Sequence, residues 1–169
     1  MICGKKINLI KFNENCITES YLGWLNNPAV VKFSSQRFKT HTFTSCLKYL
    51  ESFDKSSNLF FAITLNQTNE FVGTITAYIS DFDGTADIGI MIGEVRHWGK
   101  GLGLDSWKTL MDFLLIEQNI RKVTGGTLSC NIGMISIMKS SGMELEAVKK
   151  KQQIIDGLEQ DELYFSKFR

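Results

Sequence analysis

The chain has 169 residues, and its 19 basic and 18 acidic side chains leave a formal net charge of +1. That length predicts a single domain over residues 1–169, and so small a charge argues against a protein that coats nucleic acid without specificity. Hydrophobic residues make up 43% and charged residues 22% of the chain, which excludes wholesale disorder.

The sequence contains four cysteines, two histidines and no long apolar run. No two cysteines have the C-x-x-C spacing of a zinc site, so we expect no metal ion and four reduced, mostly buried thiols. Neither a signal peptide nor a stretch of about 18 apolar residues that would span a membrane is evident. We therefore expect a cytoplasmic protein with no membrane or nucleic-acid partner.

The first third of the chain mixes strand and helix patterns. Apolar alternation predicts a strand over residues 6–12, and Thr18 is a good N-cap for a helix that ends at residues 26–28. Weak periodicity over residues 30–42 indicates a short helical turn and a loop. A second helix is expected over residues 44–52.

Three strong strand patterns follow, over residues 58–65, 71–79 and 86–92. Short polar segments separate them, which predicts two hairpin turns and an antiparallel meander. The pattern changes at residues 93–103, where four glycines stand in eleven positions. An amphipathic helix with its apolar stripe between Leu104 and Leu115 is expected to follow this glycine-rich loop.

The last elements are a strand, a helix and a hairpin. The strand is expected at residues 120–128, and the helix at residues 131–141, where Gly142 ends it. The hairpin is expected to pair residues 143–155 with residues 161–168 around a turn at residues 156–157. The order of elements predicts an α+β fold with a mixed, mostly antiparallel sheet and helices on both faces. The crossover through the glycine-rich loop should make strands 86–92 and 121–128 parallel neighbours.

The glycine-rich loop is the most informative motif. Glycines permit positive φ angles, and successive amides turned toward the N-terminus of the following helix favour an anion such as a pyrophosphate. Arg96, His97 and Lys100 add local positive charge. The plainer alternative is a loop that only allows a tight turn from strand to helix. The Walker motif and the dinucleotide-binding G-x-G-x-x-G motif both fit this spacing poorly.

The loop fits the [Q/R]-x-x-G-x-[G/A] motif of the GNAT superfamily of acetyl-CoA-dependent N-acetyltransferases, with Arg96, Gly99 and Gly101 at the three fixed positions. Residues 86–103 resemble the branch that contains ribosomal-protein N-terminal and nucleotide-sugar acetyltransferases. Residues 131–143 resemble the family's Asn-opened helix, with Met143 in place of the usual Phe. The resemblance implies the GNAT fold and acetyl-CoA as co-substrate.

In this family the pantetheine arm lies in a gap between two strands, here residues 88–92 and 121–128. A backbone N–H near Met91 or Ile92 would face the thioester carbonyl. Asn131 would bond the pantetheine arm or a water beside it, with a role as helix cap alone as the alternative. The implied contacts of the loop with the cofactor come from Arg96, His97, Trp98, Gly99, Lys100, Gly101, Leu102, Gly103 and Leu104.

The resemblance also implies catalytic and acceptor residues. Asp87, at the head of a central strand, is the expected general base, with a merely solvated Asp as the alternative. The family's usual acidic Tyr is replaced by Met138, and Ser136 or a water would assist the leaving thiol instead. Arg37 and His41 resemble acceptor contacts of enzymes that acetylate nucleotide-linked sugars, with an ordinary solvated loop as the alternative.

The expected function is therefore acetyl transfer to a primary amine, first of all on a nucleotide-linked amino sugar. A protein N-terminus is the alternative acceptor, and a noncatalytic acyl-CoA-binding module is the third possibility. The sequence leaves the oligomeric state open, a homodimer included.

Overall fold

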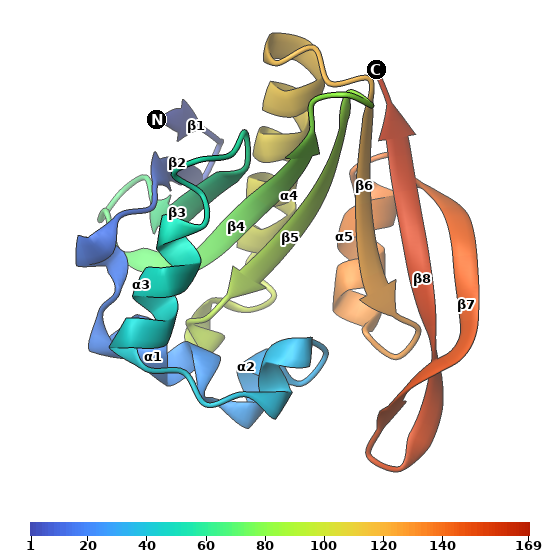
Figure 1. The fold of residues 1–169 in the computed structure, drawn as a ribbon, viewed down its shortest axis with the longest axis horizontal. Helices are drawn as coiled ribbons and strands as arrows, with labels where there is room; N and C mark the ends of the chain where they lie inside the picture. Colours follow the sequence, from blue (N-terminus) through green and yellow to red (C-terminus); the bar gives the residue numbers. More distant parts are fainter.

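The computed structural model describes residues 1–169 as an eight-stranded mixed sheet with helices on both faces (Figure 1). The strands are β1 Ile2–Cys3, β2 Ile7–Lys11, β3 Leu59–Leu65, β4 Phe71–Ser80, β5 Thr85–Ile92, β6 Lys122–Leu128, β7 Glu144–Ile155 and β8 Leu158–Phe168. The α-helices are α1 Glu19–Leu25, α2 Pro28–Val31, α3 Phe43–Glu51, α4 Leu102–Asp112 and α5 Ile132–Ser140. This is the α+β architecture that the order of elements predicts.

Side-chain caps start the helices where the sequence indicates. The Thr18 hydroxyl accepts a hydrogen bond from the Tyr21 amide at 3.2 Å, which begins α1. Thr42 and Ser45 form a reciprocal capping box at the start of α3. Each such cap stabilises its helix by about 1 kcal/mol because it satisfies an amide that has no partner within the helix.

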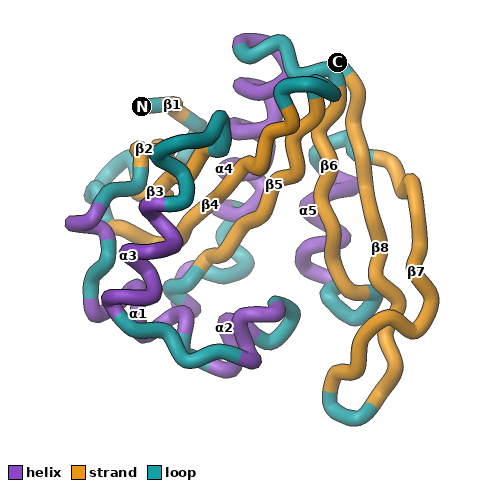
Figure 2. Tube along the Cα trace, in the orientation of Figure 1, coloured by secondary structure: helices purple, strands orange, loops and turns teal.

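The sheet is divided by the weak contact between β5 and β6. The strand order is β1-β2-β3-β4-β5-β6-β8-β7, and only the β5–β6 pair is parallel. That pairing covers Thr85–Asp87 against Lys122–Thr124 and then stops, whereas β6 pairs with β8 along its whole length. Beyond Asp87 the two strands diverge, and β6, β8 and β7 stand apart from β1–β5 (Figures 1 and 2).

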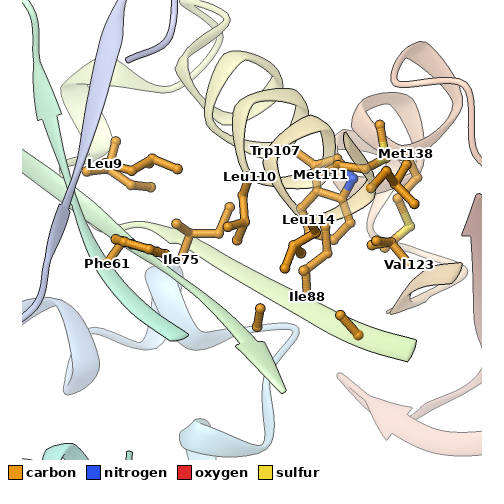
Figure 3. Packing of buried hydrophobic residues seen from close by; sticks show 14 of the residues in the cluster. Leu9, Phe61, Ile75, Ile88, Trp107, Leu110, Met111, Leu114, Val123 and Met138 are labelled. Atoms are coloured by element: carbon orange, nitrogen blue, oxygen red, sulfur yellow. The ribbon is translucent and has the colours of Figure 1, made fainter. Parts of the chain in front are cut away.

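Helices α4 and α5 cover one face of the sheet, and α1–α3 lie on the other (Figure 1). The larger apolar core lies under α4, where Trp107, Leu110 and Leu114 pack against strand residues such as Ile75 (Figure 3). A smaller aromatic core lies under α1 and α3. It contains Phe12, Ile17, Tyr21, Trp24, Leu25, Cys46, Phe53, Phe60 and Ala62.

Gly125 on β6 lies directly under the Trp107 ring. A Cβ atom at this position would stand 2.8 Å from the ring, which is closer than real Cβ contacts. We expect Gly125→Ala to lower the free energy of unfolding by about 1–3 kcal/mol through overpacking. Denaturant unfolding measures this, with Gly126→Ala as the control, because that Cβ faces the other side and meets Tyr164 at an ordinary 3.4 Å. Equal losses in the two variants would contradict the packing.

Three details differ from the sequence predictions. Strand β1 was not expected, because two residues are too few to show a periodic pattern. The helix after the glycine-rich loop continues from α4 into a π-helical turn over Phe113–Glu117. The four cysteines are free, but only Cys46 is buried, so the expectation of mostly buried thiols is wrong. No helix has the length and apolar character needed to span a membrane.

Candidate functional site

A large cleft follows the gap between β5 and β6. Its volume is about 1530 Å³, and both strands, α3, the glycine-rich loop, α5 and β8 line it. Pockets for one drug-sized ligand usually measure about 300–1,000 Å³, so this cleft has room for a long ligand and a second molecule. The cleft lies where the sequence predicts the cofactor.

The edge of β5 that faces this cleft has unpaired main-chain groups. The Gly84 carbonyl accepts from the Arg121 amide on the β6 side, whereas the Gly93 amide donates to Val72 on the β4 side. The direction of the main-chain N–H and C=O groups alternates along a strand. The N–H and C=O groups of even-numbered β5 residues therefore point toward β6, and those of odd-numbered residues point toward β4. Because the β5–β6 ladder ends at Asp87, the main chain of Ile90 is left without a strand partner on this side.

The same alternation separates the two expected amide donors. The Ile92 amide faces the gap, whereas Met91 is aligned with Thr74 and directs its amide toward β4. The Ile92 carbonyl is already used, because the Trp98 indole donates a hydrogen bond of 2.7 Å to it. Trp98 therefore fastens the glycine-rich loop to the end of β5.

Two glycines give this loop its shape. Gly99 has a φ of 74° and Gly101 a φ of 82°, in the left-handed region that side chains disfavour. Gly101 is the N-cap of α4, and no side chain caps that end of the helix. The first amides of α4 therefore have no internal partner, which favours an anion at this end of the helix.

The positive charge expected from the loop is partly neutralised. Glu70 lies 2.5 Å from the Arg96 guanidinium and 3.1 Å from His97 Nε2, and Glu94 lies 3.6 Å from Arg96. The hydrogen bond from His97, with help from Arg96, holds the pKa of Glu70 below its usual value. Arg96 and His97 thus support the loop through Glu70 and carry little free charge for a ligand. Lys100 has no such carboxylate partner, and its ammonium group lies 3.5 Å from His97 Nδ1; its expected contact with a cofactor stays a prediction.

Asp87 lies at the vertex of the gap. Its carboxylate accepts a hydrogen bond of 2.7 Å from the Thr124 hydroxyl, and it pairs in register with Tyr78 of β4. Although the side chain keeps contact with solvent, desolvation by surrounding protein atoms raises its pKa above the ordinary value, and the bond from Thr124 acts in the opposite direction. A carboxylate with a raised pKa beside a cleft is suited to accept a proton.

A pair of tyrosines stands next to Asp87 on the face covered by α3. The hydroxyl groups of Tyr49 and Tyr78 are 2.5 Å apart, and both residues line the cleft. Burial, followed by the hydrogen bond with Tyr78, raises the pKa of Tyr49 above its usual value, so this hydroxyl stays protonated. Sequence reasoning missed both tyrosines and Thr124, because nothing local connects them with Asp87.

The structure separates the two expected acceptor residues. The Arg37 guanidinium bonds the Ser34 carbonyl at 2.8 Å and Gln153 at 3.1 Å, and it stacks on Phe38 outside the cleft. Arg37 itself does not line the cleft, although Ser34 and Gln153 do, so its expected contact with an acceptor stays a prediction.

His41 does line the cleft, and Asn26 holds its main chain through two hydrogen bonds of 2.9 Å. Its Nε2 atom is buried without a hydrogen-bond partner. Because a buried polar atom is costly to leave unpaired, a ligand group at this position would be stabilised.

The Asn-opened helix contributes one polar and one apolar feature. Asn131 lines the cleft, but its side-chain oxygen caps α5 by accepting from the Met134 amide at 3.2 Å. Met138 is fully buried beside Trp107 and Gly125, so the residue that replaces the family's Tyr is part of the core. Ser136 lines the cleft. No group of three His, Cys, Asp or Glu side chains is placed to hold a metal ion.

Comparisons with known proteins agree with this geometry. The family model for the acetyltransferase (GNAT) domain matches residues 7–144. A probable N-acetyltransferase, YjcK of Bacillus subtilis, is 23% identical over 116 residues, which cover 68% of this chain but only 64% of that relative.

Two solved structures share the fold. A GNAT acetyltransferase from Bacillus anthracis has a TM-score of 0.83 at 18% identity, covering 99% of this chain and 97% of its own. A spermidine N-acetyltransferase from Vibrio cholerae, solved with CoA and spermine, has a TM-score of 0.84 at 16% identity. The match covers 96% of this chain and 95% of that chain.

Proposed function

The chain belongs to the GNAT family of acetyltransferases, and from this premise we propose that residues 1–169 form a single N-acetyltransferase domain that uses acetyl-CoA to acetylate a primary amine. The observation that carries the proposal is the unpaired edge of β5 beyond Asp87, which leads directly to the open N-terminus of α4. An extended ligand with an anionic end fits this combination of features.

The residues of the cleft fit acetyl-CoA in three places. The unpaired main chain of Ile90 would pair with an extended pantetheine arm as a further strand does, and the amide of Ile92, which faces the gap, would donate to a carbonyl oxygen. The amides of residues 97–104 would hold the pyrophosphate, with Gly101 at the N-cap of α4. When bound, acetyl-CoA supplies an activated thioester.

Asp87 is proposed as the base that takes a proton from the acceptor amine, directly or through a water. Its position at the vertex of the gap, its bond from Thr124 and its raised pKa support this role. A thiol with a pKa of about 8.5 leaves without much help, so the loss of an acidic Tyr at Met138 does not prevent the reaction. Ser136 or a water is proposed to assist the thiol.

The acceptor is proposed to be a nucleotide-linked amino sugar. With Arg37 bound to Ser34 and Gln153, the support comes from His41, which lines the cleft and has a buried Nε2 atom without a hydrogen-bond partner. The volume of the cleft also supports an acceptor larger than a simple amine.

The wild-type protein is tested by measuring acetyl-CoA consumption against amino sugars, nucleotide-linked amino sugars and N-terminal peptides. Turnover with a nucleotide-linked amino sugar is expected. Turnover confined to peptides would make the N-terminal acetyltransferase the correct function. Binding of CoA without turnover of any amine would leave a noncatalytic acyl-CoA-binding module.

With the acceptor found in this screen, His41→Ala should raise the KM for that acceptor by about 2–12-fold, the effect of one lost neutral hydrogen bond of ~0.5–1.5 kcal/mol. The KM for acetyl-CoA should not change. The matched variant is Arg37→Ala, which removes a side chain that does not itself line the cleft and should leave both constants unchanged. An effect in Arg37→Ala and none in His41→Ala would reverse the assignment of these residues.

A further inference from the structure

The turn between β1 and β2 is docked on the first turn of α4. Asp105 accepts hydrogen bonds from the amides of Lys5 at 3.2 Å and Lys6 at 2.7 Å. Gly4 lies so close to the helix that a Cβ atom there would stand 2.7 Å from the Thr109 hydroxyl. This part of the chain, far from the loop in sequence, is therefore held in a defined place beside the helix N-terminus.

From that turn the Lys6 side chain reaches the glycine-rich loop. Its ammonium group donates a hydrogen bond of 2.9 Å to the Lys100 carbonyl. A Cβ atom on Gly101 would stand only 3.4 Å from the same ammonium nitrogen. The positive charge of Lys6 is thus located beside the N-cap residue of α4.

The charges around the loop fall into two groups. Arg96 and His97 are paired with Glu70, whereas neither Lys6 nor Lys100 takes part in any ion pair of the structure. The carboxylate of Asp105 is engaged by two main-chain amides. The Lys6 ammonium group and the positive end of the helix dipole together favour an anion beside Gly101.

We propose that Lys6 is a ligand of the cofactor's pyrophosphate, supplied from the β1–β2 turn and lying outside the loop motif. The proposal rests on the proposed function, because it assumes that the loop binds CoA. Pyrophosphate is the phosphate group concerned because Lys6 stands beside Gly101, the residue at which the free amides of α4 begin. A charge-assisted contact with phosphate is stronger than the bond to the Lys100 carbonyl alone.

The test measures the affinity of CoA and of 3′-dephospho-CoA by isothermal titration calorimetry, in the wild type and three variants. Lys6→Ala should weaken both ligands roughly tenfold, in the range for a partly exposed bond to a charged group. Lys5→Ala, which removes the same charge one residue away, should stay within about twofold, since the Lys5 side chain makes no polar contact. Circular dichroism checks that the variants are folded.

Lys6→Gln separates charge from structure, because its amide is still a donor for the Lys100 carbonyl. It should lose affinity as Lys6→Ala does, and the loss should shrink as ionic strength rises, because salt screens the lost attraction. Full affinity in Lys6→Gln would reduce Lys6 to a support of the loop and overturn the proposal.

Three results of the ligand comparison also overturn it. Unchanged affinity in Lys6→Ala, with a wild type that binds CoA, refutes the role of Lys6 and leaves the proposed function intact. A loss seen with CoA but absent with 3′-dephospho-CoA assigns Lys6 to the 3′-phosphate instead of the pyrophosphate. A wild type that binds neither ligand refutes the cofactor assignment and this proposal together.

Discussion

Gly101→Val is expected to abolish measurable binding of CoA in a protein that still folds. Gly101 is the N-cap of α4 with a φ of 82°, a conformation in which valine is strained by ~1–3 kcal/mol. Relief of that strain turns the first amides of α4 away from the point where they converge. A side chain at this position also meets the Lys6 ammonium group, 3.4 Å from the Cβ atom.

The control for this variant is Gly157→Val. Gly157, at the turn between β7 and β8, has a φ of 76° with no atom near its Cβ position, so valine there causes similar strain far from the loop. Both variants should lose similar stability in thermal unfolding, but only Gly157→Val should keep its affinity for CoA in calorimetry. Wild-type affinity in folded Gly101→Val would contradict the cofactor site.

Asp87→Asn is expected to lower kcat by ~10²–10⁴-fold, the usual effect of removing a general base. Asparagine keeps the shape of the side chain and an oxygen for the Thr124 hydroxyl, so the affinity for CoA should hardly change. Asp83→Asn is the matched control, because Asp83 lies in the preceding turn, where it accepts a bond from Ser80 outside the cleft. Steady-state kinetics with the acceptor found in the screen measures both variants.

The pH dependence gives a second readout for Asp87. Its pKa is raised, so wild-type kcat should fall with decreasing pH at values above the usual Asp range of about 4. The folded state binds this proton more tightly than the unfolded state does, so the stabilising contribution is present at low pH and lost as pH rises through the raised pKa. Asp87→Asn should therefore be at least as stable as the wild type at pH 7. Normal turnover in this variant would assign the base elsewhere.

The fold was largely predictable because its signals are local. Thr18 caps α1, and the alternating strands before the glycine-rich loop form the expected meander. Asn131 caps α5 as expected, and the loop glycines have the positive φ angles that their motif suggests.

The candidate site was less predictable because its contacts join distant parts of the chain. The bond from Arg37 to Gln153 spans 116 residues and moves the guanidinium out of the cleft. Glu70 neutralises Arg96 across 26 residues, and the bond from Lys6 to Lys100 spans 94 residues. Periodicity and motif spacing contain no information on such pairs, since the tertiary fold creates them.

The pairing of β6 with β8 has a consequence for the order in which the protein is made. The chain is synthesised from its N-terminus, so its N-terminal residues leave the ribosome first. Strand β6 forms one wall of the cleft, but seven of its residues pair with β8 and only three with β5, which precedes it. On the ribosome, β1–β5 with α4 have their sheet partners early, whereas β6 waits for residues 158–168. The candidate cofactor cleft therefore cannot be complete until the last strand of the chain has been synthesised.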